Sequence, residues 1–220
     1  MIGSQRKSAC QVLKHEDYRA MPWRNGRGST LEIAREPASG EEFAWRLSLA
    51  DIEEDGDFSA YPGYRRALAL IAGNRLHLRF KRHGQRVLTP ARRGTRFEGD
   101  WKTHCAVPEG RCTDLSLIVR RGSGGRPTSI VRAPLVLRLK SSRRLVVSTG
   151  LYAALFVLEG AVTVTQSASV RARRVRTRDT LLLSPGRERT LTIRSVGPAR
   201  VVLLRWRPGR TDPGKSAHAS

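Results

Sequence analysis

Apolar and polar residues alternate along much of this chain, as they do in strands that bury one face. In FAWRLSLADI (43–52) the aromatic residues and leucines fall on one face, whereas Arg46 and Ser48 fall on the other. RLHLRF (75–80) alternates in the same way, with its two leucines and its phenylalanine on one face. Successive side chains of a strand point to opposite faces, so a period of two residues predicts strands in both segments.

The other apolar segments are short, and clusters of Gly, Pro, Asp and Ser separate them, which is typical of turns between strands. They are TDLSLIV, LVLRLK, RLVVS, YAALFVLEG, AVTVTQ, TLLLS, RTLTIRSV and ARVVLLRW. No segment has the long apolar stripe of period 3.6 that an amphipathic helix needs. The sequence therefore predicts an all-β fold, either a sandwich or a barrel.

A glycine-rich segment, GSGGRPT (122–128), divides the chain into two halves with a weak internal similarity. Each half has an apolar strand that ends in a glycine turn and leads into a second strand, ALALIAG-NRLHL in the first half and AALFVLEG-AVTV in the second. Such a repeat predicts two related β-barrels, at 10–121 and 129–207. The ends of the chain, 1–9 and 208–220, are predicted to be a flexible arm and a disordered tail.

The spacing of residues before Gly73 points to a particular kind of barrel. A jelly-roll barrel of the cupin type presents His-x-His, then Glu, then a turn glycine, and the first three side chains hold a metal. Here Arg66 stands in the Glu place, and Ser59 and Tyr61 stand in the two His places. A guanidinium is a permanent cation and cannot be a metal ligand, whereas an arginine with two hydroxyls suits an anion. We therefore predict two cupin-like barrels, a bicupin, with an anion site in the first barrel, no metal and no other cofactor. The second barrel has Ala153 at the corresponding position and is predicted to be degenerate.

WRNGRGSTLEIA (23–34) is a second candidate stretch, because two glycines around Arg27 permit a tight loop whose amides can face an anion. Its Trp-Arg pair recurs at Trp45-Arg46, where the guanidinium is expected to stack on the indole. Glu32 is expected to hold an arginine in place or to accept a ligand N–H. The predicted ligand-binding residues are Arg24, Asn25, Glu32, Arg46, Ser48, Ser59, Tyr61 and Arg66, and no residue is assigned a catalytic role.

The high positive charge of the chain bears on the classes of partner that it attracts. A net charge of +22 and a pI near 11.5 attract nucleic acid, acidic lipid or acidic small molecules. Only six of the 41 basic residues are lysine, and aromatic residues make up 6% of the chain, so bases find little to stack on. The sequence has no helix-turn-helix, zinc-finger or RRM-type pattern. A small acidic ligand is therefore the preferred partner, and nucleic acid held by the arginine-rich second half is the weaker alternative.

The cysteines and the apolar runs bear on the compartment. Cys10, Cys105 and Cys112 form no CxxC pair, which indicates reduced, buried thiols rather than a disulfide framework. The N-terminus has no apolar signal region, and no apolar run is long enough to span a membrane. We expect a soluble cytoplasmic protein without a membrane partner; a homodimer is left open.

Four stretches of the chain, in order, resemble the HutD/Ves family. Its members carry WRNGGGxTxEI, WRxSxAxI, DGxFSxFPGxxR and DLNxMxRR, and this chain has WRNGRGSTLEI, WRLSLADI, DGDFSAYPGYRR and DLSLIVRR within residues 12–121. The resemblance implies a bicupin that accompanies histidine-utilisation genes and modulates that pathway. It also implies an acidic ligand such as N-formylglutamate or urocanate, and no established catalytic activity. Arg27, Tyr61 and Ser116 depart from the family pattern, which leaves the ligand open.

A metal-free cupin enzyme is the other alternative. It would act on an acidic or imidazole-bearing substrate with Glu32 or His104 as the acid and base, since His104 follows a GDW turn within reach of the barrel mouth. No GxSxG motif, Cys/His signature or paired histidines support nucleophilic or metal catalysis. Binding is therefore preferred to catalysis.

Overall fold

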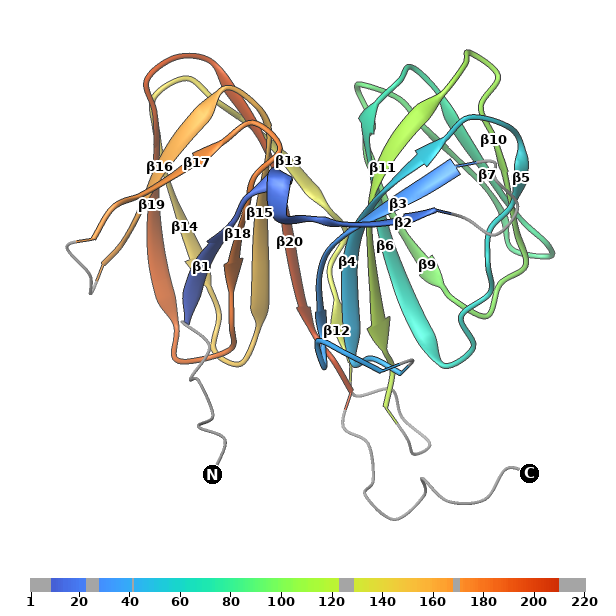
Figure 1. Ribbon diagram of the computed structural model, residues 1–220, viewed down its shortest axis with the longest axis horizontal. Coiled ribbons are helices and arrows are strands. Elements are labelled where there is room, and N and C mark those ends of the chain that lie inside the picture. Colours follow the sequence, from blue (N-terminus) through green and yellow to red (C-terminus); the bar gives the residue numbers. More distant parts are fainter. Residues whose placement is uncertain (1–8, 23–27, 41, 123–128, 168–170, 210–220) are drawn as a thin grey trace. The chain divides into compact units, whose positions relative to one another are not determined.

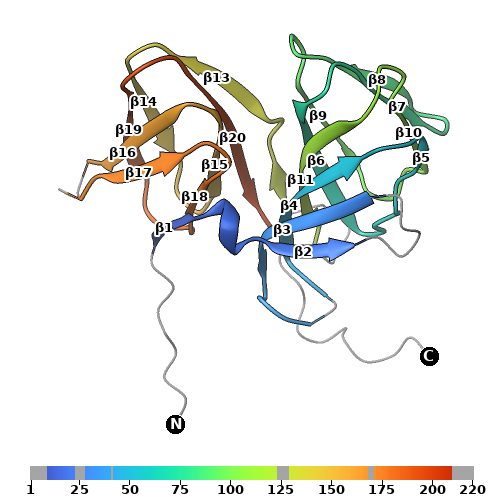
Figure 2. The same cartoon turned by 45° about the horizontal axis from the view of Figure 1, so that its top comes forward.

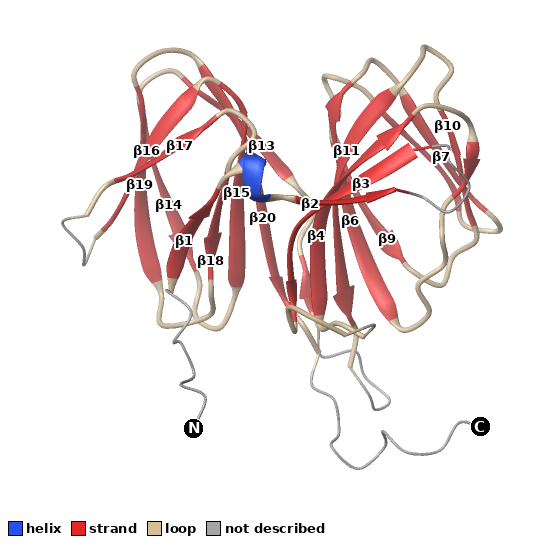
Figure 3. Cartoon of the chain, in the orientation of Figure 1, coloured by secondary structure: helices blue, strands red, loops and turns tan. Residues whose placement is uncertain are grey.

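The computed structural model describes residues 9–22, 28–40, 42–122, 129–167 and 171–209. They form two units: the pocket unit, within 18–135 and 206–209, and the C-terminal unit, within 9–17 and 136–205. Strands make up both units (Figure 3), and the one helical element among the described residues is a 3-10 turn, η1 (His15–Asp17). The all-β class expected from the sequence is confirmed. In the part of the chain that the structure describes, no helix has the length and apolar character needed to cross a membrane.

In the pocket unit, a six-stranded and a four-stranded antiparallel sheet face each other (Figures 1 and 2). The apolar cluster of this unit includes Leu68, Leu78 and Phe97, which are almost inaccessible to solvent, and their burial stabilises the unit. The six-stranded sheet has the order β2 (Arg19–Pro22), β3 (Gly28–Glu36), β4 (Trp45–Ile52), β11 (Cys112–Arg120), β6 (Tyr64–Ala72) and β9 (Gly94–Glu98). The four-stranded sheet has the order β5 (Gly56–Asp57), β10 (Thr103–Ala106), β7 (Leu76–Phe80) and β8 (Gly84–Leu88).

The alternation that predicted strands is present in β7 and β4. In β7 the two leucines and Phe80 are buried, and His77 and Arg79 between them are more exposed. In β4 the apolar positions are buried as predicted, and Trp45 packs edge-on against Trp206 with ring centroids 5.0 Å apart. Ser48, on the other face of β4, is also buried. Both faces of β4 are therefore covered, and its polar face borders the cavity described below.

The C-terminal unit also has two sheets, and its apolar cluster includes Leu155, Leu191 and Val201. One sheet has the order β1 (Cys10–Leu13), β18 (Thr180–Leu183), β15 (Tyr152–Glu159) and β20 (Ala199–Arg207), with β13 (Leu135–Leu139) also paired to β20. The other has the order β14 (Ser142–Val147), β19 (Arg189–Ser195), β16 (Ala161–Gln166) and β17 (Arg173–Arg176).

The two units share one strand order. The series β9-β6-β11-β4 of the pocket unit corresponds to β18-β15-β20-β13, and β8-β7-β10-β5 corresponds to β17-β16-β19-β14. The similar sequence segments at 67–78 and 153–164 fall in β6-β7 and β15-β16, which are equivalent pairs. The weak internal similarity of the sequence therefore reflects a repeated topology.

The units divide the chain at other positions than the glycine-rich segment 122–128. Cys10–Leu13 pairs with β18, so the first strand belongs to the C-terminal unit although it precedes the pocket unit in sequence. At the other end, the last residues of β20 pair with β12 (Ile130–Val131) in the pocket unit. Strand pairing between distant segments leaves no local signal, and β1 covers an edge of β18 that would otherwise be open. The segments 1–8 and 210–220, within the predicted arm and tail, lie outside the described residues.

Candidate functional site

The pocket unit contains a cavity of about 770 Å³, between the six-stranded sheet and the segment 54–61. Strands β4 and β11 supply one wall. Their register sets Ser48 opposite Ser116 and Arg46 opposite Ile118, and all four residues line the cavity. Residues directly opposite each other in an antiparallel pair point to the same face, so alternate residues of both strands face the cavity.

Five of the eight predicted ligand residues line this one cavity: Arg46, Ser48, Ser59, Tyr61 and Arg66. Arg24 and Asn25 lie outside the described residues. Glu32 is opposite Ser48 and therefore on the same face of the sheet, but its buried side chain does not line the cavity. Its Oε1 lies 4.0 Å from Nε of Arg19 on β2, so Glu32 meets an arginine that does not line the cavity. The role of these residues in binding stays a prediction.

Aromatic rings and a phenol hold Arg46. Its Nη2 donates a hydrogen bond of 2.8 Å to the hydroxyl of Tyr61. The guanidinium lies 5.1 Å from the ring centroid of Phe43 and 5.4 Å from that of Tyr61. The expected stacking on Trp45 is wrong, because neighbouring residues of a strand point to opposite faces. The buried Nε of Arg46 has no hydrogen-bond partner among the described residues.

Arg66 is the more deeply buried arginine, with 7% of its surface exposed. Its Nη1 reaches the backbone oxygen of Ser59 at 3.4 Å, and its guanidinium lies 4.8 Å and 5.1 Å from the ring centroids of Phe58 and Phe97. No carboxylate among the described residues forms an ion pair with it. Burial lowers the pKa of this guanidinium, and the carboxylate of Asp114 opposes the shift. A buried cation without an ion-pair partner favours a site for an anion.

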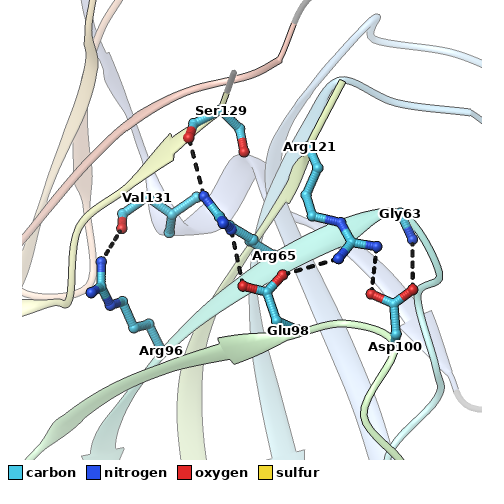
Figure 4. A network of polar contacts seen from close by, with 8 residues as sticks. All are labelled: Gly63, Arg65, Arg96, Glu98, Asp100, Arg121, Ser129 and Val131. Carbon is cyan, nitrogen blue, oxygen red and sulfur yellow. Dashed lines mark hydrogen bonds and ion pairs between the residues drawn. The ribbon is translucent and has the colours of Figure 1, made fainter. Parts of the chain in front are cut away.

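The neighbouring arginine, Arg65, has a structural role (Figure 4). Its Nε lies 3.0 Å from Oε1 of Glu98, and its Nη1 donates to the backbone oxygen of Ser129 at 3.3 Å. Arg121 joins the same network through Glu98 and through Asp100, at 3.3 Å and 2.7 Å. Arg65 is thus neutralised by an ion pair with Glu98, whereas Arg66 has no ion-pair partner among the described residues and lines the cavity.

The cavity residues that were not predicted from the sequence include Asp114 and Ser116 on β11. Asp114 is 1% exposed and Ser116 is 4% exposed, and both line the cavity. Burial raises the pKa of Asp114 to about 7, although the nearby guanidinium of Arg66 lowers it. Asp114 and Ser116 are the first and third residues of DLSLIVRR, one of the four stretches that carry the family resemblance. They could have been proposed as site residues on that ground, but the stretch was interpreted only as a strand.

His104 does not line this cavity. Alternation in β10 directs Cys105 to the cavity instead, and Nδ1 of the exposed His104 lies 2.9 Å from Oδ1 of Asp57. Burial raises the pKa of the Cys105 thiol, so it is protonated and a poor nucleophile at neutral pH. All three cysteines are free and buried. Among the described residues, no group of three His, Cys, Asp or Glu side chains is placed to hold a metal ion.

The sequence matches a family model over most of its length and curated relatives over about half of it. The family model described as HutD matches residues 15–201. An uncharacterized 21.2 kDa protein from the hutC 3' region of Pseudomonas putida is 39% identical over 112 residues, which are 50% of this chain and 58% of that protein. Protein Ves of Citrobacter koseri is 34% identical over 113 residues, 50% of this chain and 59% of that protein. The matched segments thus span less than two thirds of these relatives.

Solved structures match more of the chain. A conserved protein of unknown function from Pseudomonas aeruginosa PAO1 has a TM-score of 0.79 at 28% identity, covering 90% of this chain and 98% of that one. HutD from Pseudomonas fluorescens SBW25 has a TM-score of 0.70 at 27% identity with the same coverage. Oxalate decarboxylase from Lactobacillus farciminis has a TM-score of 0.63 at 10% identity, over 90% of this chain and 86% of that one, a likeness of fold alone. The fold is therefore cupin-like.

Proposed function

This chain belongs to the HutD family, and we propose that its pocket unit binds a small organic acid whose carboxylate lies between Arg46 and Arg66. The observation that carries the proposal is Arg66, a buried guanidinium on the cavity wall with no ion-pair partner in the described part of the chain. A carboxylate would supply the missing countercharge and accept two parallel hydrogen bonds from one guanidinium. The hydroxyls of Ser48 and Tyr61 would orient it.

The donor set supports binding without a metal. A cupin metal site needs neutral or anionic ligands, and here the equivalent places hold Ser59, Tyr61 and Arg66, a set that does not fit a metal. The shared strand order of the two units supports a bicupin in which only the pocket unit carries a ligand site. Ligands of the N-formylglutamate or urocanate class suit the family. Binding would lower the free concentration of such an acid in the cell or present the acid to a partner protein. The three free cysteine thiols are consistent with the reducing environment of the cytoplasm.

Thermal melting tests the proposed function. A ligand that binds only the native state stabilises it, so N-formylglutamate or urocanate at about 100 times its Kd should raise the melting temperature by about 5–10 °C. The methyl esters of the same acids are the matched controls, because they keep the shape and lose the negative charge. Equal shifts with acids and esters, or no shift with any organic acid of this size, would contradict the proposal.

A second candidate function, nucleic-acid binding, is supported by one face of the C-terminal unit. On β14, β19, β16 and β17 the register places Arg174 and Arg194 each opposite Thr163, and Arg144 opposite Thr192. Arg176 lies on the same face, opposite Ala161. All four arginines are exposed and form no ion pair with any described residue. Arginines among threonines, with no aromatic residue at these positions, suit phosphates rather than stacked bases.

Salt dependence of duplex DNA binding tests this second candidate. If the four guanidiniums each neutralise one phosphate, affinity for a 20-base-pair duplex should fall by about 100-fold between 50 and 200 mM salt, as measured by fluorescence anisotropy. Replacing all four by glutamine should remove most of that binding. A control with the same change of charge replaces four exposed arginines of the pocket unit: Arg79, Arg82, Arg86 and Arg92. Equal losses in the two variants would show a net-charge effect and reject this face as the site.

A further inference from the structure

A second hollow of the pocket unit lies on the four-stranded sheet β5-β10-β7-β8 (Figure 2). It is a groove of about 480 Å³, and four basic side chains line it: Arg79, Lys81, Lys102 and His104. The alternate residues of β7 and β10, among them Leu78 and Cys105, belong to the apolar cluster, so the basic side chains lie on the other face of the sheet. Of the described residues that line the groove, only Asp57 also lines the cavity.

The strand register places the four basic side chains in two rows that cross the sheet. His104 on β10 is opposite Arg79 on β7. At the next position on this face, the backbone N–H of Lys81 donates to the backbone oxygen of Lys102 at 2.9 Å, which continues the register and sets the two lysines opposite each other. Opposite residues lie about 5 Å apart, and successive positions on one face lie about 7 Å apart along a strand. The four side chains therefore start from a small area of the sheet.

The lysine row lacks the countercharge that other strand pairs of this unit have. Arg65 on β6 is opposite Glu98 on β9, and the two residues form an ion pair. In the groove, Arg79, Lys81 and Lys102 form no ion pair with any described residue. Like charges directly opposite each other destabilise a sheet. Two facing lysines beside an arginine therefore favour an anion that neutralises them.

The one carboxylate among the described residues that line the groove is paired with the histidine. Asp57 is opposite His104, and its Oδ1 lies 2.9 Å from Nδ1 of that ring. Because a carboxylate accepts and does not donate hydrogen bonds, Nδ1 carries the hydrogen and Nε2 is the ring nitrogen left for another partner. Arg79 and the two lysines outnumber this carboxylate by two. The groove therefore keeps an excess of two positive charges even with Asp57 included.

We propose that this groove binds the phosphate group of a small phosphomonoester, at a site separate from the cavity. At neutral pH a phosphomonoester carries nearly two negative charges and three strong acceptor oxygens, which match the excess charge and the donors of both rows. A phosphodiester or a carboxylate supplies only half of that charge. The volume of the groove is in the range of small-molecule sites. The inference goes beyond the proposed function and does not depend on it, because neither lysine lines the cavity.

A matched pair of phosphates tests the inference by calorimetry at low ionic strength, where exposed charges are least screened. Phenyl phosphate is the monoester, and methyl phenyl phosphate is a diester of similar shape with one negative charge. The wild-type protein should bind the monoester about 10-fold more tightly, because the second charge reaches the second row. Replacing Lys81 and Lys102 by glutamine should weaken the monoester by about 10-fold, as expected for the loss of two exposed ion pairs. The control replaces Arg86 and Arg92, exposed arginines of the same unit that do not line the groove, and should change little.

Four results would overturn the inference. They are no binding of phenyl phosphate by the wild-type protein, equal binding of the monoester and the diester, equal losses in the lysine variant and its control, and a loss in Arg66→Ala as large as that in the lysine variant. The last of these would place the phosphate in the cavity. A 20-base-pair duplex that displaces phenyl phosphate and loses affinity in the lysine variant would instead assign the groove to a nucleic-acid surface. The proposed function is tested with organic acids and stands or falls separately.

Discussion

Replacement of Arg66 by alanine is expected to weaken the binding of an organic acid by about 10- to 100-fold. The substitution removes a charge-assisted hydrogen bond, typically worth about 1.5–3 kcal/mol, between the ligand and a side chain that is only 7% exposed. Isothermal titration with N-formylglutamate or urocanate measures the change. Arg66→Lys should recover only part of the loss, because an ammonium group cannot make the two parallel hydrogen bonds of a guanidinium.

The adjacent arginine provides the control for this experiment. Arg65→Ala removes the same side chain one position away, but Arg65 pairs with Glu98 outside the cavity, so its loss should leave ligand affinity unchanged. It should cost at most about 1 kcal/mol of stability, as expected for a partly exposed ion pair. The stability of the ligand-free Arg66→Ala protein should change little or rise, because burial of the guanidinium and its repulsion by Arg46 disfavour the charge and oppose its attraction to Asp114. An Arg66→Ala protein that binds normally and melts much earlier would assign Arg66 to the scaffold.

The sequence could predict that Arg66, Ser59 and Tyr61 face the interior of the pocket unit, because a turn glycine sets the register of the strand before it. Gly73 has φ of 89°, a conformation that residues with a Cβ rarely adopt, and it ends the run of β6. Counting back from this fixed point with the spacing of the cupin motif gives the expected inward positions. Ser59, Tyr61 and Arg66 were identified in this way, and all three line the cavity.

The features that the sequence could not predict depend on contacts between segments that are distant in the chain. A polar residue in a strand faces either water or a cavity, and only the second sheet decides which, so Asp114 was indistinguishable from an exposed position of the same pattern. The position of β1 is likewise set by its pairing with the free edge of β18, a strand more than 160 residues further along the chain. His104 was misplaced for a related reason: a one-residue difference in register exchanges it with Cys105.

Asp114 should also make the stability of the ligand-free protein fall as pH rises towards 8. Its pKa is about 7 in the folded state against 3.8 for a free side chain, because burial disfavours the charged form more than Arg66 favours it. The folded state therefore holds a proton that the unfolded state has released between these two values. The stabilising contribution is fully present below pH 4 and is lost as pH rises through 7.

Asp114→Asn removes this titration while keeping the shape of the side chain. At roughly 1.4 kcal/mol per pKa unit, the variant should gain on the order of 3–4 kcal/mol of stability relative to wild type between pH 4 and pH 8. Urea denaturation of both proteins at intervals across this range measures the difference, in which the titrations of all other groups cancel. The groups that bear on Asp114 are Arg66 on β6, Asp51 on β4, Cys105 on β10 and Cys112 on β11, and all four are retained in the variant. A difference that stays flat across the range would mean that Asp114 is ionised in the folded protein throughout, with Arg66 as its partner. The anion site would then already be filled by the chain's own carboxylate.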